Sequence, residues 1–170
     1  MQKLKVVRTG CVEEPEVRYT SPCQICDRFS REMMALDREC FIVLHLDGKN
    51  RIVARELVSV GSLQQSIVHP REVFKGAVLN GSASIICLHN HPSGDPKPSP
   101  EDLIITKRLQ EAGEILGIKV LDHLIIGDRS AYSIISKELM KPTTAKKQQP
   151  VIVPRPRRKA GNRPAMVAAS

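Results

Sequence analysis

Apolar and polar positions follow two periods along the chain, one typical of helices and one typical of strands. Apolar residues recur every three or four positions over 21–37, after "HP" at 69–70 and after "SPED" at 99–102, and each spacing predicts a helix. The first helix should open on a capping serine and an early proline, and the other two should stop at "NG" and at Gly117. The predicted buried faces are Ile25, Phe29, Met33 and Leu36, then Val73, Phe74, Ala77 and Val78, then Ile105, Leu109, Ala112 and Leu116.

Continuous apolar runs predict strands between these helices. "CFIVLHLDGKNRIVARELVSVG" holds two such runs joined at "DGKN", residues 47–50, which is a β-hairpin signal. "ASIICLHNH" and "KVLDHLIIG" indicate two further strands, the first buried on both faces. We also expect a short strand at "LKVVRT" and one or two turns at the end of "AYSIISKELM". Because helices alternate with strands, the expected fold class is α/β or α+β, a single central β-sheet flanked by helices.

Composition and charge divide the chain into three parts. A length of 170 residues suits one domain, which we place at 21–140, after a strand and link at 1–20. The last 30 residues hold eight Lys and Arg and no acid, so the formal net charge of +8 lies entirely in a Pro-rich tail, 141–170, expected to be disordered. Such a tail could bind nucleic acid weakly and nonspecifically through phosphates, or serve only as a solvated appendage.

Cysteine usage and hydropathy indicate the compartment. Five cysteines stand at scattered positions, no signal-peptide core opens the chain, and no run approaches the ~18 apolar residues that span a bilayer. We therefore expect a soluble, cytoplasmic protein with no membrane partner. Cys23 and Cys26 are better explained as two small apolar residues of one helix than as half of a zinc site, and Cys40 and Cys87 as core.

The stretch "LHNHPSGDPKPSPED", residues 88–102, carries the strongest chemical signal. Residues two apart on a strand point to the same side, so His89 and His91 should project together with Asn90 turned away. With Asp102, one turn inside the next helix, they would give two imidazoles and a carboxylate, a set that suits Zn²⁺ and leaves a fourth position for water. Zinc lowers the pKa of such a water toward ~7, so this is a catalytic type of site.

The same residues have simpler explanations. The two histidines could be polar residues at a strand–loop junction. Ser99 and Asp102 also form a good helix start, in which the serine caps the helix and the acid complements its dipole. Capping and metal binding are compatible, because a rigid helix start would hold the carboxylate in place.

The stretch "HNHPSGDPKPSPED", with "ELVSVGSLQQSIVHPREVFKGAV" before it and "AGEILGIKVLDHLIIG" after it, resembles RadC-type proteins, a bacterial branch of the JAB/MPN (JAMM-motif) metallopeptidase-like domains. The similarity runs from about Ser21 to Leu139. It implies a JAB/MPN-like, cytidine-deaminase-like sandwich around a mixed sheet. Longer members carry a DNA-binding helix–hairpin–helix region, for which about twenty preceding residues are too few, so we expect a short form with little support for the family's DNA-repair label.

The resemblance implies one zinc ion held by His89, His91 and Asp102 with a water. It also implies an upstream Glu that accepts the water's proton, and a serine, Ser99 here, that stabilises the oxyanion. We assign the general base to Glu39, which should open the strand "ECFIVLHL", with Glu56 on the next strand and Glu72 at a helix start as rivals.

The expected activity is zinc-dependent hydrolysis of an amide bond in a peptide or protein, as in a peptidase or isopeptidase. The alternatives are a metal-dependent nuclease or DNA-processing accessory, and a non-enzymatic protein that binds DNA through its basic tail. Among the other polar residues, His45 is expected to be a sheet residue. Either Asp122 or His123 could orient a ligand imidazole or simply be a satisfied polar residue at a sheet end.

Overall fold

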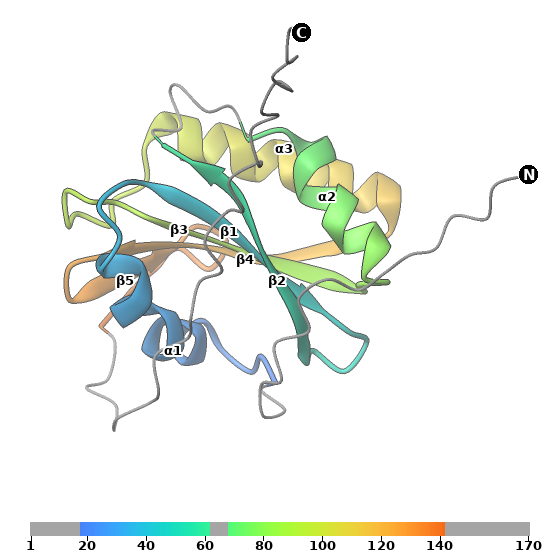
Figure 1. Ribbon diagram of the computed structural model, residues 1–170, viewed down its shortest axis with the longest axis horizontal. Coiled ribbons are helices and arrows are strands. Elements are labelled where there is room, and N and C mark those ends of the chain that lie inside the picture. Colours follow the sequence, from blue (N-terminus) through green and yellow to red (C-terminus); the bar gives the residue numbers. More distant parts are fainter. Residues whose placement is uncertain (1–17, 62–67, 142–170) are drawn as a thin grey trace, which may run out of the picture.

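A mixed β-sheet runs through the middle of the molecule, with helices on both of its faces (Figure 1). The computed structural model describes residues 18–61 and 68–141, and within them three helices pack on six strands. In chain order the elements are α1 (Pro22–Met34), β1 (Cys40–Leu46), β2 (Ile52–Val60), α2 (Pro70–Leu79), β3 (Ser84–Asn90), α3 (Pro100–Leu116), β4 (Lys119–Gly127), β5 (Ser130–Ser133) and β6 (Glu138–Met140). The α/β class and the single mixed sheet predicted from the sequence are confirmed.

The strand order brings distant parts of the chain to one end of the sheet. The order is β2-β1-β3-β4-β5-β6, with β1 antiparallel to both β2 and β3, and β3 parallel to β4. The start of β1 therefore lies beside the carboxyl end of β3, where Phe41 pairs with His89. α3 connects the parallel strands β3 and β4, and a loop, residues 91–99, leads from that same end of β3 to its first turn. Ligand sites of open α/β sheets form at such carboxyl ends.

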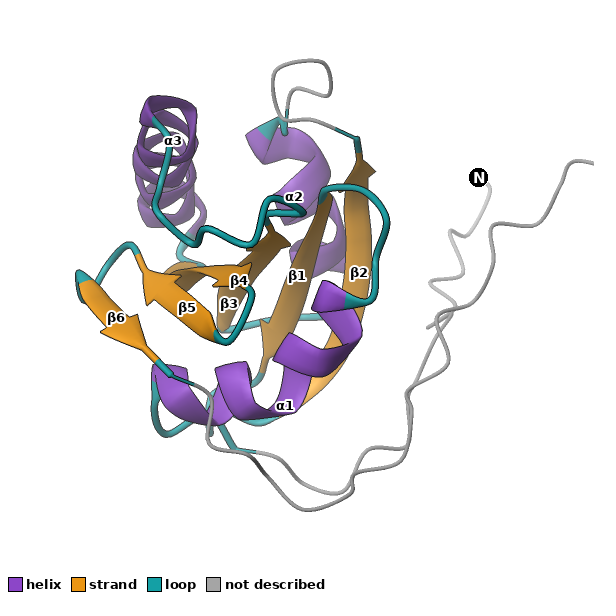
Figure 2. Ribbon diagram, turned by 90° about the vertical axis from the view of Figure 1, so that its left-hand side faces the viewer, coloured by secondary structure: helices purple, strands orange, loops and turns teal. Residues whose placement is uncertain are grey.

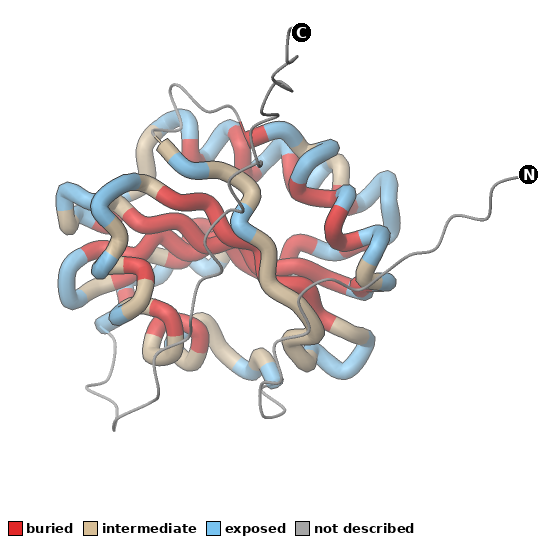
Figure 3. Tube along the Cα trace, viewed as in Figure 1, coloured by how far each residue is buried: buried red, intermediate tan, exposed pale blue. Residues whose placement is uncertain are grey.

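Two apolar cores cover the two faces of the sheet, and the strand period decides which residue joins which core. Figure 2 shows α1 on one face and α2 with α3 on the other, and Figure 3 shows the buried residues concentrated in the central strands. Even-numbered residues of β1 and β3, such as Leu44 and Leu88, pack with α1. Odd-numbered residues, such as Phe41 and Cys87, pack with α2 and α3. His89 therefore faces α2 and α3, and Asn90 faces α1.

The predicted hairpin is confirmed, and the segment after residue 130 forms two strands that were not predicted. β1 and β2 pair antiparallel, and the Asp47 carboxylate accepts the backbone N–H groups of Lys49 and Arg51 in the turn. Residues 134–137 form a turn, and the strands β5 and β6 pair on either side of it. Alternate residues of β5 are buried against the edge of the sheet, and Met140 of β6 completes the core on the α1 side, so this segment has strand spacing.

The predicted buried helix faces are correct except at their carboxyl ends. Val78 is 59% exposed and Leu116 is 49% exposed, and α1 ends at Met34, before Leu36. Val78 lies ~100° around the helix from Ala77, beyond the arc that meets the sheet. In α3 the buried stripe continues from Leu109 to Gly113, where the helix comes too close to the Ile118 carbonyl for a side chain. The next buried residue after Leu109 is therefore Gly113, four positions on, whereas the predicted face continued at Ala112, three positions on.

Some predictions fall outside the described residues. The strand at 4–9 and nearly all of the tail 141–170 lie there, so these elements and the domain boundaries at 20 and 141 stay predictions. Among the described helices, none combines the length and the apolar character needed to cross a membrane.

Candidate metal centre

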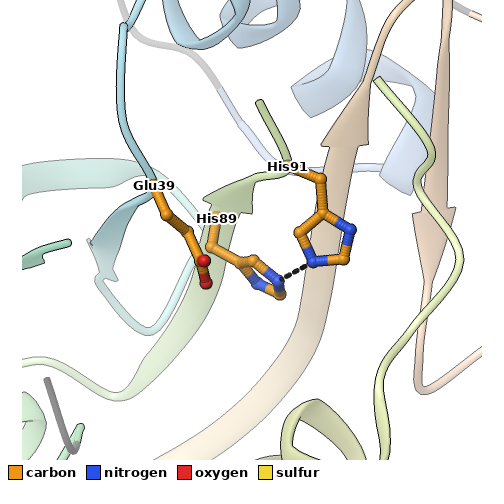
Figure 4. A group of neighbouring side chains, drawn as sticks. All are labelled: Glu39, His89 and His91. Atoms are coloured by element: carbon orange, nitrogen blue, oxygen red, sulfur yellow. Dashed lines mark hydrogen bonds between the residues drawn. The ribbon is translucent and has the colours of Figure 1, made fainter. Parts of the chain in front are cut away.

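Two imidazole rings meet at the carboxyl end of β3. His89 is the penultimate residue of that strand and His91 is the first residue after it, and their Nε2 atoms lie 3.0 Å apart (Figure 4). His89 is fully buried, whereas the side chain of His91 is 17% exposed. The structure thus brings the two predicted histidines together, with one ring accessible from solvent.

Asp102 reaches the same point from the first turn of α3. Its Oδ1 lies 3.2 Å from Nε2 of His89, and its Oδ2 lies 3.5 Å from Nε2 of His91. Ser99 caps the helix, and both its backbone N–H and its hydroxyl donate to Oδ2 of Asp102 at 2.7 Å. Within the described part of the chain, the buried Oδ1 accepts no hydrogen bond. The capping box therefore holds one carboxylate oxygen and leaves the other directed at the imidazoles.

The spacing of these three groups fits a small divalent cation. Zinc binds nitrogen and oxygen ligands at ~2.0–2.1 Å in a tetrahedron, whose edges are then ~3.3–3.4 Å long. The Nε2 atoms of His89 and His91 are 3.0 Å apart, and Oδ1 of Asp102 lies 3.2 Å from Nε2 of His89, both near that length, whereas it is the other oxygen, Oδ2, that lies 3.5 Å from Nε2 of His91. A buried acceptor without a donor is costly unless a ligand or ion satisfies it, so the donor set fits zinc.

A second carboxylate stands at the site. Glu39 immediately precedes β1 and directs its side chain toward the His89 ring (Figure 4). One carboxylate oxygen of Glu39 and one ring nitrogen each of His89 and His91 lie within 4.8 Å of one another, so these three residues could also hold a metal ion. The backbone on both sides of Glu39 is fixed by the side chain of Asn90, which accepts from the N–H of Cys40 and donates to the carbonyl of Arg38.

The other two glutamates considered from the sequence lie elsewhere. Glu56 is on β2 with its carboxylate 3.6 Å from Nε2 of His45, which pairs with Ile85, ~13 Å along β3 from His89. Glu72 is exposed in the first turn of α2 and bonds Lys75 at 2.9 Å. Only Glu39 of the three comes to the histidine pair.

Each histidine has a partner on its other ring nitrogen. Nδ1 of His91 lies 2.7 Å from the carbonyl oxygen of Asp95 in the loop that follows β3. Nδ1 of His89 lies 2.8 Å from Nε2 of His123 on β4, and Nδ1 of His123 lies 2.6 Å from the hydroxyl of Thr106. Such partners orient imidazole ligands and fix which nitrogen faces a metal.

The site's charges are strongly coupled. Burial alone would raise the pKa of Asp102, but the neighbouring His89 and His91 rings and the Ser99 N–H outweigh it and hold that pKa well below the usual carboxyl range. The Asp102 carboxylate in turn raises the pKa of His91, against the effect of burial. Burial, followed by the neighbouring His89, lowers the pKa of His123 well below that of a free imidazole, so this ring is neutral.

Of the pair left open in the sequence, His123 contacts the site and Asp122 does not. Asp122 points to the opposite face, where the hydroxyl of Ser133 donates to both its oxygens. Sequence reasoning missed the contacts of Asn90 and Thr106. A buried Asn between two site residues was a usable signal for the first, whereas Thr106 carries no pattern that links it to a residue 17 positions away. Cys26, Cys40 and Cys87 are buried as expected, and Cys23 is exposed.

Known proteins resemble the part of the chain that carries this site. A family model described as "RadC-like JAB domain" matches residues 19–139. A UPF0758 protein of Pelobacter propionicus is 58% identical over 123 residues, which is 72% of this chain and 54% of the relative. A UPF0758 protein of Methanosarcina mazei is 50% identical over 130 residues, 76% of this chain and 57% of the relative. The chain spans about half the length of the curated relatives it matches.

Proposed function

Because the chain belongs to the RadC-like JAB domain (UPF0758) family, we propose that it is a zinc-dependent hydrolase that cleaves amide bonds in a peptide or protein substrate. The observation that carries the proposal is the buried Oδ1 of Asp102, without a hydrogen-bond donor among the described residues and 3.2 Å from Nε2 of His89. An ionised carboxylate and two imidazole nitrogens are a donor set of the kind that holds zinc with one position left open, which supports the proposal.

In this proposal Asp102 is the third ligand and Glu39 is the base. Asp102 is fully buried, with Oδ1 at 3.2 Å from Nε2 of His89 and Oδ2 at 3.5 Å from Nε2 of His91, whereas Glu39 is partly exposed. A ligand should be rigid and dry, and a base should reach both the site and the solvent that supplies water. The two carboxylates meet these two requirements separately.

The chain's own residues then divide the chemistry. Bound zinc supplies a Lewis acid that polarises a carbonyl oxygen and makes water easier to deprotonate. The Glu39 carboxylate accepts a proton from the attacking water and delivers it to the nitrogen of the leaving amine. His89, His91 and Asp102 stay in place throughout, because each is held by a further hydrogen bond.

The Ser99 hydroxyl donates to the Asp102 carboxylate in the structure, and in this proposal it donates to the oxyanion during the reaction. Its single hydroxyl proton is directed at Oδ2 of Asp102, so donation to a developing oxyanion requires that proton to turn toward the substrate. The Ser99 backbone N–H, also 2.7 Å from Oδ2, keeps Asp102 in place while the hydroxyl turns. The cap and the oxyanion role predicted for this residue are therefore compatible.

To test the proposal, the zinc-loaded full chain is incubated separately with four kinds of substrate: unfolded peptides, isopeptide-linked conjugates, single-stranded DNA and duplex DNA. The proposal expects new amino termini from an amide substrate, lost with a chelator and in the Glu39→Gln variant. Cleavage of DNA with intact amide substrates would replace it with a nuclease. Amide cleavage that persists in Glu39→Gln and under chelation would contradict the proposed site.

A further inference from the structure

A buried chain of hydrogen bonds joins two of the proposed metal ligands behind the site. The Thr106 hydroxyl donates to the backbone carbonyl of Asp102 at 2.6 Å. The hydroxyl oxygen of Thr106 also lies 2.6 Å from Nδ1 of His123. Nε2 of His123 lies 2.8 Å from Nδ1 of His89. All four residues are at most 3% exposed, so water does not compete for these contacts. The chain crosses from α3 through β4 to β3.

The direction of this chain is set at its Asp102 end. A carbonyl oxygen only accepts, so the single hydroxyl proton of Thr106 lies on that contact, and Thr106 must accept from Nδ1–H of His123. His123 is fully buried between a hydroxyl and an imidazole, neither of which compensates a positive charge, so its ring carries a single N–H. With that N–H at Nδ1, Nε2 of His123 accepts from Nδ1–H of His89. The opposite direction would leave two oxygens 2.6 Å apart with no proton between them, which is unfavourable.

We propose that Thr106 and His123 are positioning residues that keep His89 in the tautomer whose Nε2 carries no proton and can accept a metal ion. The inference rests on the proposed function only in taking His89 as a ligand. His91 gains the same tautomer directly, because its Nδ1 faces the Asp95 carbonyl. For the deeper His89, the protein reaches a backbone carbonyl through two intermediate side chains.

Phe41 packs against both imidazole rings of this hydrogen-bond chain, His89 and His123. The Phe41 ring stacks on His89 with a centroid distance of 6.1 Å and meets the edge of His123 at 5.3 Å. Since Asp102 supplies both a carboxylate and the carbonyl that ends the chain, the first turn of α3 sets two ligands at once. Removing the hydroxyl of Thr106 should therefore change the tautomer of His89, although Thr106 reaches His89 only through His123.

The test compares Thr106→Val, which removes the hydroxyl and keeps the shape, with Thr106→Ser, which keeps the hydroxyl. Histidine-labelled, metal-free full chain is studied by long-range ¹H–¹⁵N NMR at about pH 8, above the ordinary imidazole pKa of ~6.5. Wild type and Thr106→Ser should show His89 protonated at Nδ1. In Thr106→Val, His123 is free to protonate Nε2, so His89 should move to the Nε2–H tautomer. Thr106→Ala gives the same readout if the valine variant does not fold.

The second readout is zinc affinity by chelator competition. Thr106→Val should bind zinc ~10–100-fold more weakly than Thr106→Ser, the usual cost of losing a partner behind a ligand. A His89 ring protonated at Nε2 in the wild type, or equal tautomers and equal affinities in the two variants, would overturn the inference. If the wild type binds no zinc, the proposed function fails, and the tautomers of the metal-free protein still decide the inference by themselves.

Discussion

The side-chain carbonyl of Asn90 accepts a hydrogen bond from the backbone N–H of Cys40 at 2.8 Å, across a separation of 50 residues. Its amide group donates to the carbonyl of Arg38 at 3.1 Å. Asn90 thereby fixes the residues on both sides of Glu39, while its own neighbours in sequence, His89 and His91, point to the metal site. One tripeptide thus positions two proposed ligands and the proposed base.

Replacing Asn90 with Ala should separate catalysis from metal binding. The Cys40 N–H would lose its buried acceptor, at a cost of ~1–3 kcal/mol, and Glu39 would no longer be held at the histidines. A misplacement of about 1 Å can cost ~10²-fold in rate. We expect kcat to fall by that order with one zinc still bound, as measured by steady-state kinetics and metal analysis. Loss of zinc from a variant that remains folded would contradict this role.

Substituting Glu39 tests whether this carboxylate is base or ligand. Glu39→Gln keeps the shape and removes the basicity, so turnover should fall ~10²–10⁴-fold while zinc stays bound. Glu56→Gln is the matched control, because Glu56 lies beside His45 and should leave both activity and zinc unchanged. Loss of zinc in Glu39→Gln would assign Glu39 to the ligand set instead.

The loop after β3 packs closely on the end of β4, and Gly127 makes this possible. A Cβ at Gly127 would overlap the Gly94 carbonyl oxygen and approach Pro96 to 2.8 Å. Gly127→Ala should therefore displace the loop that carries the Asp95 carbonyl, the partner of His91. We expect a loss of ~1–3 kcal/mol in unfolding free energy, the usual cost of overpacking, together with weaker zinc binding.

The control for Gly127 is Gly48→Ala, in the turn between β1 and β2. A Cβ there would meet nothing within 4 Å. Urea unfolding and chelator competition on both variants decide the matter, and equal stability of the two would show that the contact at Gly127 is not restrictive.

Zinc affinity should depend on pH through His91. The Asp102 carboxylate raises the pKa of His91, so the folded, metal-free protein keeps a proton there to a higher pH than a free imidazole, ~6.5, would. That proton stabilises the metal-free fold below this range, and its contribution fades as the pH rises through the raised pKa. Zinc must displace it, so affinity should fall by up to ~10-fold per pH unit below the raised pKa. Calorimetry in buffers of different ionisation enthalpy should detect proton release, and binding without release below pH ~6.5 would contradict this.

The sequence predicted the central elements well because their patterns are local. Strand runs such as "CFIVLHL" and the turn at Asp47 are set by neighbouring residues, and the period of two placed His89 and His91 together. The strands β5 and β6 were missed because short strands at a sheet edge gain stability from a partner strand that the local sequence does not reveal.

Site contacts between distant segments were harder to predict. Glu39 could be chosen only by its place before a strand, and its approach to the histidines depends on β1 running antiparallel to β3. The hydrogen bond between Thr106 and His123 depends on how α3 lies over β4, and the spacing of apolar residues in the sequence does not predict that placement. Ser99 and Asp102 had two explanations in the sequence, and the capping box shows that the cap holds the carboxylate at the site.

The most direct test is the zinc content of the purified full chain and of two variants after exposure to excess zinc and exhaustive dialysis. We predict one zinc per chain in the wild type, one in Glu39→Gln, and none in Asp102→Asn, which removes the buried anionic oxygen beside His89. A wild-type chain without zinc, or an Asp102→Asn variant that keeps its zinc, would contradict the ligand set of His89, His91 and Asp102.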